Sequence, residues 1–325
     1  MTTRAPVALT CGEPAGVGLE LAGKAWRALG ADTAFFLIAD PAHVPPDVPV
    51  ARIDHPSETA QASRHGLPLL AHDFPAPARP GRPEPANARA VIEVIERAVG
   101  LVRAGEARAL CTAPINKKAL KDGAGFAFPG HTEFLAHLAG VRRVVMMLAC
   151  DELRVVPTTI HIPLGAVPAA LGPDLLGDTI RITHAALQRD FAIAKPRIAV
   201  AGLNPHAGEG GAMGQEELDW INPTLASLRA QGLEVTDAQP ADTLFHARAR
   251  ARYDAAVAMY HDQALIPIKT LAFDEGVNLT LGLPFVRTSP DHGTAFDIAG
   301  QGIARPDSLM AALRMARDLG ERRQR

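Results

Sequence analysis

Three of the twelve histidines follow apolar segments that are typical of buried strands. His161 lies near the end of LRVVPTTIHI, His206 follows RIAVAGL, and His261 follows DAAVAMY. Open α/β sheets bind ligands at the carboxyl ends of their strands, where these imidazoles would project. Three imidazoles with one open position suit a divalent ion such as Zn²⁺. Their wide spacing matches no local metal motif, so separate structural or surface histidines are the alternative.

Two aspartates and a lysine near such positions are candidate proton acceptors. Asp262 adjoins His261 in YHDQ, and Asp242 lies in PADTLF. Each aspartate suits a general base or a partner of a metal ligand, and the alternative is a solvated loop carboxylate. Lys117 follows an expected strand in TAPINKKAL, so it either faces a site or starts a helix.

The segment GHTEFLAHL (130–138) has the pattern of a helix with Thr132 as its N-cap. A phosphate group could bind at this helix N-terminus beside His131 and Thr132, and simple capping is the alternative. Lys269 and Arg287 could add positive charge, and Asn278 could bind a polar substrate. Singly, side chains of these types usually face solvent.

The turn CGEPAGVG (11–18) has glycines at 12, 16 and 18 and follows the first expected strand. It is neither a P-loop nor G-x-G-x-x-G. It either contacts a nucleotide or substrate through its backbone or is a plain strand–helix turn.

These candidate residues stand between alternating strand and helix patterns. Helices are expected over 87–103 and 307–320, with Asn87 and Asp307 as possible caps, and over 174–190 and 215–231. Further strands are expected at 6–10, 34–39, 107–113, 144–149 and 233–238. The alternation predicts an α/β fold with a largely parallel sheet and helices on both faces. Residues 41–85 contain eleven of the 27 prolines, so we expect irregular loop with one short strand at most.

Length, composition and charge limit the domain number, the partners and the cellular compartment that we expect. The 325 residues suffice for one large or two medium domains, and the net charge is −2 without runs of like charge. We therefore expect no nucleic-acid partner and no membrane partner, and an anionic substrate would need a local cluster of donors. Three widely spaced cysteines argue against a disulfide framework and suggest a reducing cytoplasm. We find no signal-peptide pattern and no apolar run near the length of a membrane span.

The motifs together resemble a known family. DHGTAFDIAGQGIARP (291–306) resembles the nicotinamide-binding loop of isopropylmalate and isocitrate dehydrogenases, and CGEPAGVG looks like their glycine-rich turn. The full series, with GHTEF, TTIHIPL, GLNPHAGEGG, MGQEE, PADTLF, AMYHDQ and GVNLTLGLPFVRTS, is similar to the 4-hydroxythreonine-4-phosphate dehydrogenase family of pyridoxal phosphate synthesis. These motifs run in order from residue 10 to about residue 303.

The resemblance implies a fold and a set of partners. It implies two α/β/α domains around a cleft, like isopropylmalate and isocitrate dehydrogenases. Residues 1–128 with 285–325 would bind the cofactor, and residues 129–284 would bind metal and substrate and form the dimer. It also implies a homodimer whose active site, including the metal ligation, is shared at the subunit interface.

The resemblance also implies roles for individual residues. One divalent ion (Zn, Mg or Co) would be held by His161, His206 and His261. A small phosphorylated substrate would be bound by His131, Thr132, Lys269, Asn278 and Arg287. NAD or NADP would be bound by Gly12, Glu13, His292, Gly293 and Asp297. The catalytic candidates are Asp242, Asp262 and Lys117.

The implied activity is oxidation of 4-phosphooxy-L-threonine to a β-keto acid that decarboxylates to 3-amino-2-oxopropyl phosphate. A paralogue acting on 4-phosphoerythronate, threonate 4-phosphate or a cyclic diol carboxylate is an alternative. A three-histidine metal hydrolase and a non-catalytic metabolite sensor are further alternatives. Three positions depart from the family pattern, namely Cys11, Ala264 and Arg305. Arg305 leaves NAD and NADP open, because its charge could favour a 2′-phosphate.

Overall fold

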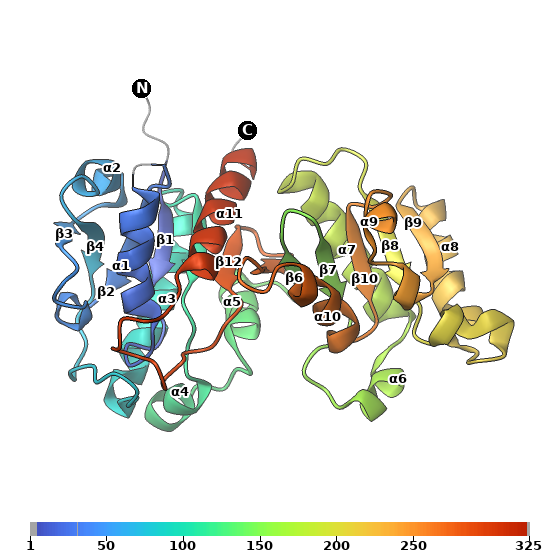
Figure 1. Cartoon of the computed structure of the whole chain (residues 1–325), viewed down its shortest axis with the longest axis horizontal. Helices are drawn as coiled ribbons and strands as arrows, with labels where there is room; N and C mark the ends of the chain where they lie inside the picture. Colours follow the sequence, from blue (N-terminus) through green and yellow to red (C-terminus); the bar gives the residue numbers. More distant parts are fainter. Residues whose placement is uncertain (1–4, 31, 324–325) are drawn as a thin grey trace. The chain divides into compact units, whose positions relative to one another are not determined.

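The computed structural model describes residues 5–30 and 32–323, and its contacts divide the chain into two compact units. Unit 1 comprises Met1–Arg142 and Leu283–Arg325, and unit 2 comprises Arg143–Gly282 (Figure 1). We expected the first boundary after residue 128, but residues 129–142 belong to unit 1. The helix over His131–Ala139 contacts the helix over Ala88–Arg103 there, so it adds to the helical layer of unit 1.

The described strands of unit 1 form a parallel sheet in the order β3-β4-β2-β1-β5-β12. Their bounds are β1 Val7–Thr10, β2 Phe35–Ala39, β3 Val50–Ile53, β4 Leu67–Ala71, β5 Ala109–Thr112 and β12 Arg287–Pro290. The segments VALT and FFLIA are buried at every residue, as expected for strands covered on both faces. Because the strands are parallel, the loops that follow β1, β5 and β12 leave the same edge of the sheet.

Helices cover both faces of the unit 1 sheet (Figure 1). Their bounds are α1 Gly18–Leu29, α2 Thr59–Ala62, α3 Ala88–Arg103, α4 Lys117–Ala124, α5 His131–Ala139 and α11 Asp307–Arg323. In Figure 1, α1 and α11 lie in front of the sheet and α3 lies behind it. The apolar face expected for α3 is buried, with Val94 and Ile95 fully inaccessible. The Asn87 side chain does not cap α3, because it pairs with the backbone of Ala76 through two hydrogen bonds of 3.0 and 2.9 Å.

The proline-rich stretch 41–85 is more regular than expected. It contains two strands, β3 and β4, and three single 3₁₀ turns, η1 (Pro41–His43), η2 (Pro56–Glu58) and η3 (Pro85–Asn87). Each of these turns has proline at its first position, where the fixed φ and the missing N–H fit a helix start. The prediction of irregular loop was therefore wrong, because most prolines stand between the strands rather than within them.

Unit 2 contains a mixed sheet in the order β11-β6-β7-β10-β8-β9. The bounds are β6 Val145–Ala149, β7 Arg154–Pro157, β8 Arg197–Ala201, β9 Glu234–Gln239, β10 Ala255–Ala258 and β11 Val277–Leu281. The strands β7, β10, β8 and β9 are parallel, whereas β6 is antiparallel to both of its neighbours. A short turn closed by the Cys150 N–H and the Leu153 carbonyl, 2.9 Å apart, joins β6 to β7. So short a connection permits only an antiparallel pair.

Helices also cover both faces of the unit 2 sheet. Their bounds are α6 Val167–Ala170, α7 Pro173–Arg189, α8 Asn222–Ala230, α9 Ala247–Arg250 and α10 His261–Leu271. No helix was expected at α10, which packs on β7 and β10 and buries Leu265 and Ile268. In Figure 1, α10 lies in front of this sheet and α7 lies behind it. A π turn, η6 (Glu217–Ile221), precedes α8, where one continuous helix over 215–231 was expected.

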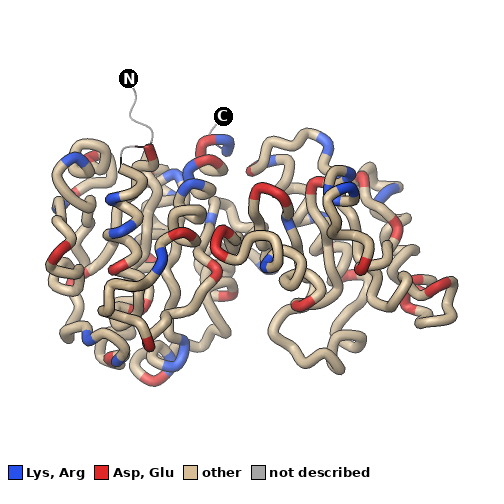
Figure 2. The backbone as a smooth tube through the Cα atoms, in the orientation of Figure 1, with Lys and Arg blue, Asp and Glu red and all other residues tan. Residues whose placement is uncertain are grey.

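The α/β fold class predicted from the alternation of strands and helices is confirmed. Acidic and basic positions are interspersed over each unit (Figure 2). The three cysteines are buried and form no disulfide. No helix among the described residues has the length and hydrophobicity needed to cross a membrane.

Candidate active site

Two of the three candidate metal ligands lie together in unit 2. His161 follows the end of β7 by four residues, and His261 is the first residue of α10 and follows the end of β10 by three residues. The strands β7 and β10 are neighbours, so their following loops meet at one edge of the sheet. The two imidazole rings have centroids 5.7 Å apart at an interplanar angle of 42°. Both rings line a pocket of about 220 Å³ that includes Tyr260 and Leu164.

Asp262 orients His261. Its Oδ1 lies 2.7 Å from Nδ1 of the imidazole. A carboxylate in this position favours the tautomer with a proton on Nδ1, which leaves the Nε2 lone pair for a metal ion. Asp262 is therefore placed to orient His261 as a candidate metal ligand.

His206 lies in a loop with unusual backbone geometry. Within η5 (Pro205–Gly211), the five residues from His206 to Gly210 all have positive φ, between 44° and 80°. Three of them carry side chains, and each such residue costs roughly 1–2 kcal/mol in this region. His161 also has a positive φ, of 53°. Strain of this kind persists where surrounding contacts over-determine the backbone, and it concentrates at functional sites.

The structure does not join His206 to the other two histidines within one chain. Over residues 5–30 and 32–323, no group of three or more His, Cys, Asp or Glu side chains is placed to hold a metal ion. His161 and His206 are exposed and His261 is partly exposed, so each can be reached from outside the chain. The three-histidine site thus stays a prediction, and it needs a ligand from a second copy or a movement of the loop.

Hydrogen bonds connect the three histidine-bearing loops to one another. Thr159 donates its hydroxyl to the Met259 carbonyl at 2.8 Å, which ties the His161 loop to the turn before His261. Gln263 accepts a bond from the Met259 N–H at 2.7 Å and donates Nε2 to the Gly202 carbonyl at 2.8 Å. Gln263 therefore links the His261 turn to the strand end that leads into His206. Sequence reasoning missed both side chains.

The remaining unit 2 candidates are more dispersed. Asp242 is exposed in the short turn η7 (Ala241–Thr243). Lys269 lies eight residues after His261 on α10, which separates the two along the helix axis by roughly 12 Å. Asn278 is the second residue of β11 and pairs with Leu148 of β6.

The predicted phosphate turn lies in unit 1. The helix α5 begins at His131, and Gly130 is its N-cap in an extended conformation. Thr132 is thus the second helical residue, and the prediction that it caps the helix was wrong. The first N–H groups of a helix have no intrahelical acceptor, so they are available to an anion. A Cβ on Gly130 would lie 3.7 Å from the Nζ of Lys117, the first residue of α4.

Two basic side chains surround His131. Burial, followed by the positive charges of Arg287 and Lys117, holds the pKa of His131 well below its usual value. The imidazole is therefore neutral near pH 7, and its buried Nε2 has no hydrogen-bond partner among the described residues. An unpartnered buried polar atom close to two positive charges suits a ligand that supplies an acceptor.

Arg287 is itself buried, with an exposed fraction of 5%. Its Nη2 and Nε donate to Oγ1 of Thr112 at 2.6 and 3.2 Å. Burial lowers the pKa of Arg287 to about 10, so the guanidinium stays charged at neutral pH. A buried guanidinium with rigid geometry is suited to bind a phosphate group. Thr112 was not among the predicted site residues.

The glycine-rich turn and the predicted cofactor loop contact each other in unit 1. The Val17 N–H donates to the Thr294 carbonyl at 3.1 Å, and a Cβ on Gly16 would lie 2.8 Å from the same oxygen. Gly12 has φ +67°, and a Cβ there would meet the Pro114 carbonyl in the loop after β5. Glycine is therefore required at both positions, where the turn packs against these two loops.

The polar residues of these two segments differ in their surroundings. Glu13 is buried and accepts a hydrogen bond from the Ala15 N–H at 3.1 Å, and burial raises its pKa. His292 places Nδ1 2.8 Å from the Gly293 carbonyl, while its buried Nε2 has no partner among the described atoms. Asp297 and Gly293 are exposed. Lys24 anchors the end of this loop by donating to the carbonyls of Gly302 and Ala304 at 2.9 and 2.6 Å.

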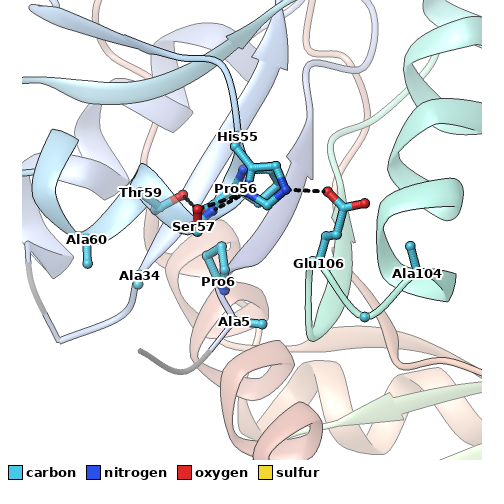
Figure 3. A pocket seen from close by; sticks show the side chains of 11 residues that line it. Ala5, Pro6, Ala34, His55, Pro56, Ser57, Thr59, Ala60, Ala104 and Glu106 are labelled. Atoms are coloured by element: carbon cyan, nitrogen blue, oxygen red, sulfur yellow. Dashed lines mark hydrogen bonds and ion pairs between the residues drawn. The ribbon is translucent and has the colours of Figure 1, made fainter. Parts of the chain in front are cut away.

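A pocket of about 300 Å³ in unit 1 lies at the other edge of its sheet (Figure 3). It is lined by Pro6 before β1, Ala34 before β2 and Glu106 before β5. His55 lies 3.1 Å from Glu106 and 2.9 Å from the Ser57 hydroxyl. The imidazole also caps η2 by accepting the Ser57 N–H. Because this edge carries the amino ends of the strands, we assign the group a structural role.

Comparisons with known proteins agree over nearly the whole chain. The family model described as pyridoxal phosphate biosynthetic protein PdxA matches residues 29–316. A 4-hydroxythreonine-4-phosphate dehydrogenase of Roseobacter denitrificans is 61% identical, covering 98% of each chain. The crystal structure of a 4-hydroxythreonine-4-phosphate dehydrogenase from Klebsiella pneumoniae has a TM-score of 0.89 and 37% identity, covering 97% of this chain and 99% of that one.

A more distant structure is also similar. A terephthalate 1,2-cis-dihydrodiol dehydrogenase from Burkholderia xenovorans has a TM-score of 0.67 and 28% identity, covering 96% of this chain and 97% of that one. The resemblance drawn from the motifs is therefore confirmed, as are the α/β fold class and the assignment as an oxidoreductase. On the extent of the family match and the identity of its relatives, the chain belongs to the PdxA family of pyridoxal phosphate biosynthetic proteins.

Proposed function

We propose that the chain oxidises 4-hydroxythreonine-4-phosphate (4-phosphooxy-L-threonine) and releases the product as 3-amino-2-oxopropyl phosphate and CO₂. The observation that carries this proposal is the group formed by the charged side chains of Arg287 and Lys117 and the neutral imidazole of His131 at the N-terminus of α5. A dihydrodiol carboxylate would not need this set of phosphate donors. The 61% identity to a relative of this name, against 28% to the dihydrodiol dehydrogenase, supports the same choice.

The phosphoryl group of the substrate would bind in unit 1. Arg287 supplies a charged and preoriented guanidinium, and Thr112 fixes its orientation. Neutral His131 donates from Nε2, and Thr132 donates from the first turn of α5. Lys117 adds a positive charge beside Gly130. The family resemblance also assigns Lys269 and Asn278 to substrate binding.

The chemistry of His161, His206 and His261 fits a divalent cation. Two of the rings are close together, and the Asp262 contact leaves Nε2 of His261 available. Imidazole ligands favour zinc or cobalt over magnesium, which prefers oxygen ligands. When bound, such an ion supplies Lewis-acid assistance at the hydroxyl oxygen and at the carbonyl that follows it.

Unit 1 would hold the nicotinamide nucleotide against the glycine-rich turn and residues 292–297. Gly12 and Glu13 shape the turn, and the buried Nε2 of His292 offers a hydrogen-bonding group to the nucleotide, with Gly293 and Asp297 nearby in sequence. When bound, NAD or NADP accepts the hydride from C3 of the substrate. Arg305 is paired with Asp307 at 3.2 Å. Because this pairing offsets its charge, we propose NAD as the preferred cofactor.

Asp242 is our candidate for the base that takes the hydroxyl proton. The two other candidates have different contacts, because Asp262 bonds to His261 and Lys117 lies beside Gly130. Oxidation at C3 produces a ketone in the β position to the carboxylate. The C–CO₂ bond then breaks, its electron pair passes into the enolate, and a proton returns to carbon to give the amino ketone.

We further propose a homodimer formed through unit 2. Eight large apolar side chains are exposed among the described residues, and all but Ile303 lie in unit 2. The seven exposed apolar side chains of unit 2 lie near the candidate metal ligands in the sequence: Ile162, Leu164, Met213, Leu218, Ile266, Leu271 and Phe273. Exposed apolar surface of this extent marks an interface, and a second copy there would bring its own histidines. The three buried, reduced thiols are consistent with a cytoplasmic location.

A direct assay tests the proposed function. The purified chain is incubated with Zn²⁺ or Co²⁺, 4-phosphooxy-L-threonine and either NAD or NADP, and reduced nucleotide is followed by absorbance. We expect turnover with NAD and release of CO₂. Parallel reactions contain 4-phosphoerythronate, threonate 4-phosphate or a cyclic diol carboxylate. A preference for one of these by kcat/KM would replace the proposed substrate, and turnover without any nucleotide would indicate the hydrolase alternative.

A further inference from the structure

The loop that presents His206 is held by one buried carboxylate. Glu217 has an exposed fraction of 1%, although glutamate is seldom buried without partners. It belongs to the π turn η6, a geometry that is frequent at functional sites. No role in the reaction proposed above requires Glu217 to touch the substrate, the cofactor or the metal ion.

The contacts of Glu217 lead to the base of the loop. Its Oε1 accepts the backbone N–H of Asn204 at 2.9 Å, and its Oε2 accepts Nδ2 of Asn204 at 2.9 Å. Asn204 directly precedes η5 and occupies its N-cap position. Both carboxylate oxygens thus fix Asn204, two residues before the run of positive φ begins at His206.

The loop is also shaped around the carboxylate from two sides. A Cβ on Gly202 would lie 3.1 Å from Oε1, and a Cβ on Gly208 would lie 2.8 Å from Oε2. The two glycines flank His206, so the backbone approaches Glu217 both before and after the histidine. The positive φ values from His206 to Gly210 therefore occur where the backbone closes over this side chain.

We infer that Glu217 is a positioning residue for the proposed metal site, which sets the backbone conformation that presents the His206 imidazole. This inference rests on the proposed function, because it concerns the ligand role of His206. Partners that orient a ligand typically change metal affinity or activity by roughly 10- to 100-fold when they are removed.

The test uses Co²⁺ as a probe, whose visible absorption reports on coordination without turnover. Glu217→Gln replaces one acceptor oxygen by an amide that faces a donor of Asn204. We expect the affinity for Co²⁺ to fall by roughly 10- to 100-fold with an altered absorption spectrum. Glu209→Gln is the matched control: it removes one negative charge from an exposed loop residue, and we expect less than a threefold change. The KM for NAD should be the same in all variants.

A rescue variant covers the case in which Glu217→Gln does not fold, as judged by circular dichroism and Trp220 fluorescence. The triple variant N204D/E216Q/E217Q exchanges donors and acceptors, because Glu216 also accepts Nδ2 of Asn204 at 2.8 Å. Recovery of both folding and Co²⁺ affinity supports the positioning role, and failure to recover both overturns it. A folded Glu217→Gln variant with Co²⁺ affinity within threefold of the parent overturns it equally.

Failure of the proposed metal site gives a different result. In that case the parent chain does not bind Co²⁺, or His206→Ala binds it as tightly as the parent. If the parent binds Co²⁺ and His206→Ala does not, the metal site stands and Glu217→Gln decides the further inference alone.

Discussion

The hydroxyl of Thr112 makes a contribution that can be isolated by one nearly isosteric change. Thr112 is fully buried at the end of β5, and Oγ1 accepts two hydrogen bonds from the buried guanidinium of Arg287. Thr112→Val keeps the branched shape and removes the acceptor. A hydrogen bond to a charged group contributes about 1.5–3 kcal/mol, and a buried donor left unsatisfied carries a similar cost. We therefore expect the free energy of unfolding to fall by roughly 2–3 kcal/mol.

The same change should affect the substrate more than the cofactor. Without the hydroxyl of Thr112, the guanidinium of Arg287 would lose two of the hydrogen bonds that position it for the phosphoryl group. Small displacements of a positioning group cost up to roughly 100-fold in rate, so we expect kcat/KM for the phosphorylated substrate to fall 10- to 100-fold. The KM for NAD should change less than twofold, because the proposed cofactor residues belong to other segments, the glycine-rich turn and the loop over 292–297.

Urea denaturation followed by circular dichroism measures the first effect, and steady-state kinetics measures the second. Thr112→Ser is the matched control, because it retains the hydroxyl and loses only a methyl group. If Thr112→Val equals Thr112→Ser in both stability and kcat/KM, the hydroxyl does not orient Arg287 and the positioning role of Thr112 is refuted.

Three further predictions address individual side chains. The pKa of His131 is lowered on folding, so the folded state binds fewer protons than the unfolded state and stability is lost as pH falls below about 6.5. His131→Gln should reduce that loss of stability by up to about 1.4 kcal/mol per pH unit. Urea denaturation between pH 5 and 7.5 measures this effect. His206→Ala should abolish Co²⁺ binding and turnover with an unchanged circular dichroism spectrum, and full activity after exhaustive chelation would exclude the metal role. Asp262→Asn should weaken Co²⁺ binding by roughly 10- to 100-fold, and an unchanged titration would remove Asp262 as the partner of His261.

The elements with strong hydrophobic periodicity could be predicted from the sequence. The face of α3 and the buried segments VALT and FFLIA follow directly from apolar patterning. Helix α10 could not, because Pro267 lies inside it and weakens the helical pattern. In the segment 41–85, the high density of proline led to a prediction of irregular loop, although β3 and β4 are short strands of mostly apolar residues.

Some candidate site residues could likewise be predicted from the sequence, and others could not. Residues in recognisable motifs, such as His131 and Arg287, were predicted, and the structure brings them together with Lys117. Thr112, Gln263 and Glu217 were missed because each is defined by a hydrogen-bond partner outside its own local motif, and for Thr112 and Gln263 that partner is distant in sequence. Thr112 bonds to a residue 175 positions away, and Gln263 to one 61 positions away. A polar residue inside an otherwise apolar strand, as in ALCT, was the one local signal for Thr112.

The two candidate binding regions differ in a way that has a measurable consequence. The candidate phosphate-binding residues of unit 1 include the buried guanidinium of Arg287 and come from one chain, whereas the candidate histidine ligands of unit 2 are exposed or partly exposed and lie near exposed apolar side chains in the sequence. In addition, no three ligands in the described part of a chain are placed to hold one metal ion. If a second copy completes the metal site, Co²⁺ affinity must depend on protein concentration and fall on dissociation of the dimer. The affinity for inorganic phosphate must be independent of protein concentration and of dimer dissociation.

Phe273→Glu would introduce a charge at a side chain with an exposed fraction of 73% and so oppose dimer formation. We expect this variant to sediment as a monomer, to lose Co²⁺ affinity and to retain binding of inorganic phosphate, measured by calorimetry. Lys118→Glu, an exposed change in unit 1, is the control for added negative charge and should remain dimeric. A monomeric Phe273→Glu protein with full Co²⁺ affinity would mean that one chain completes the site by moving its own His206 loop.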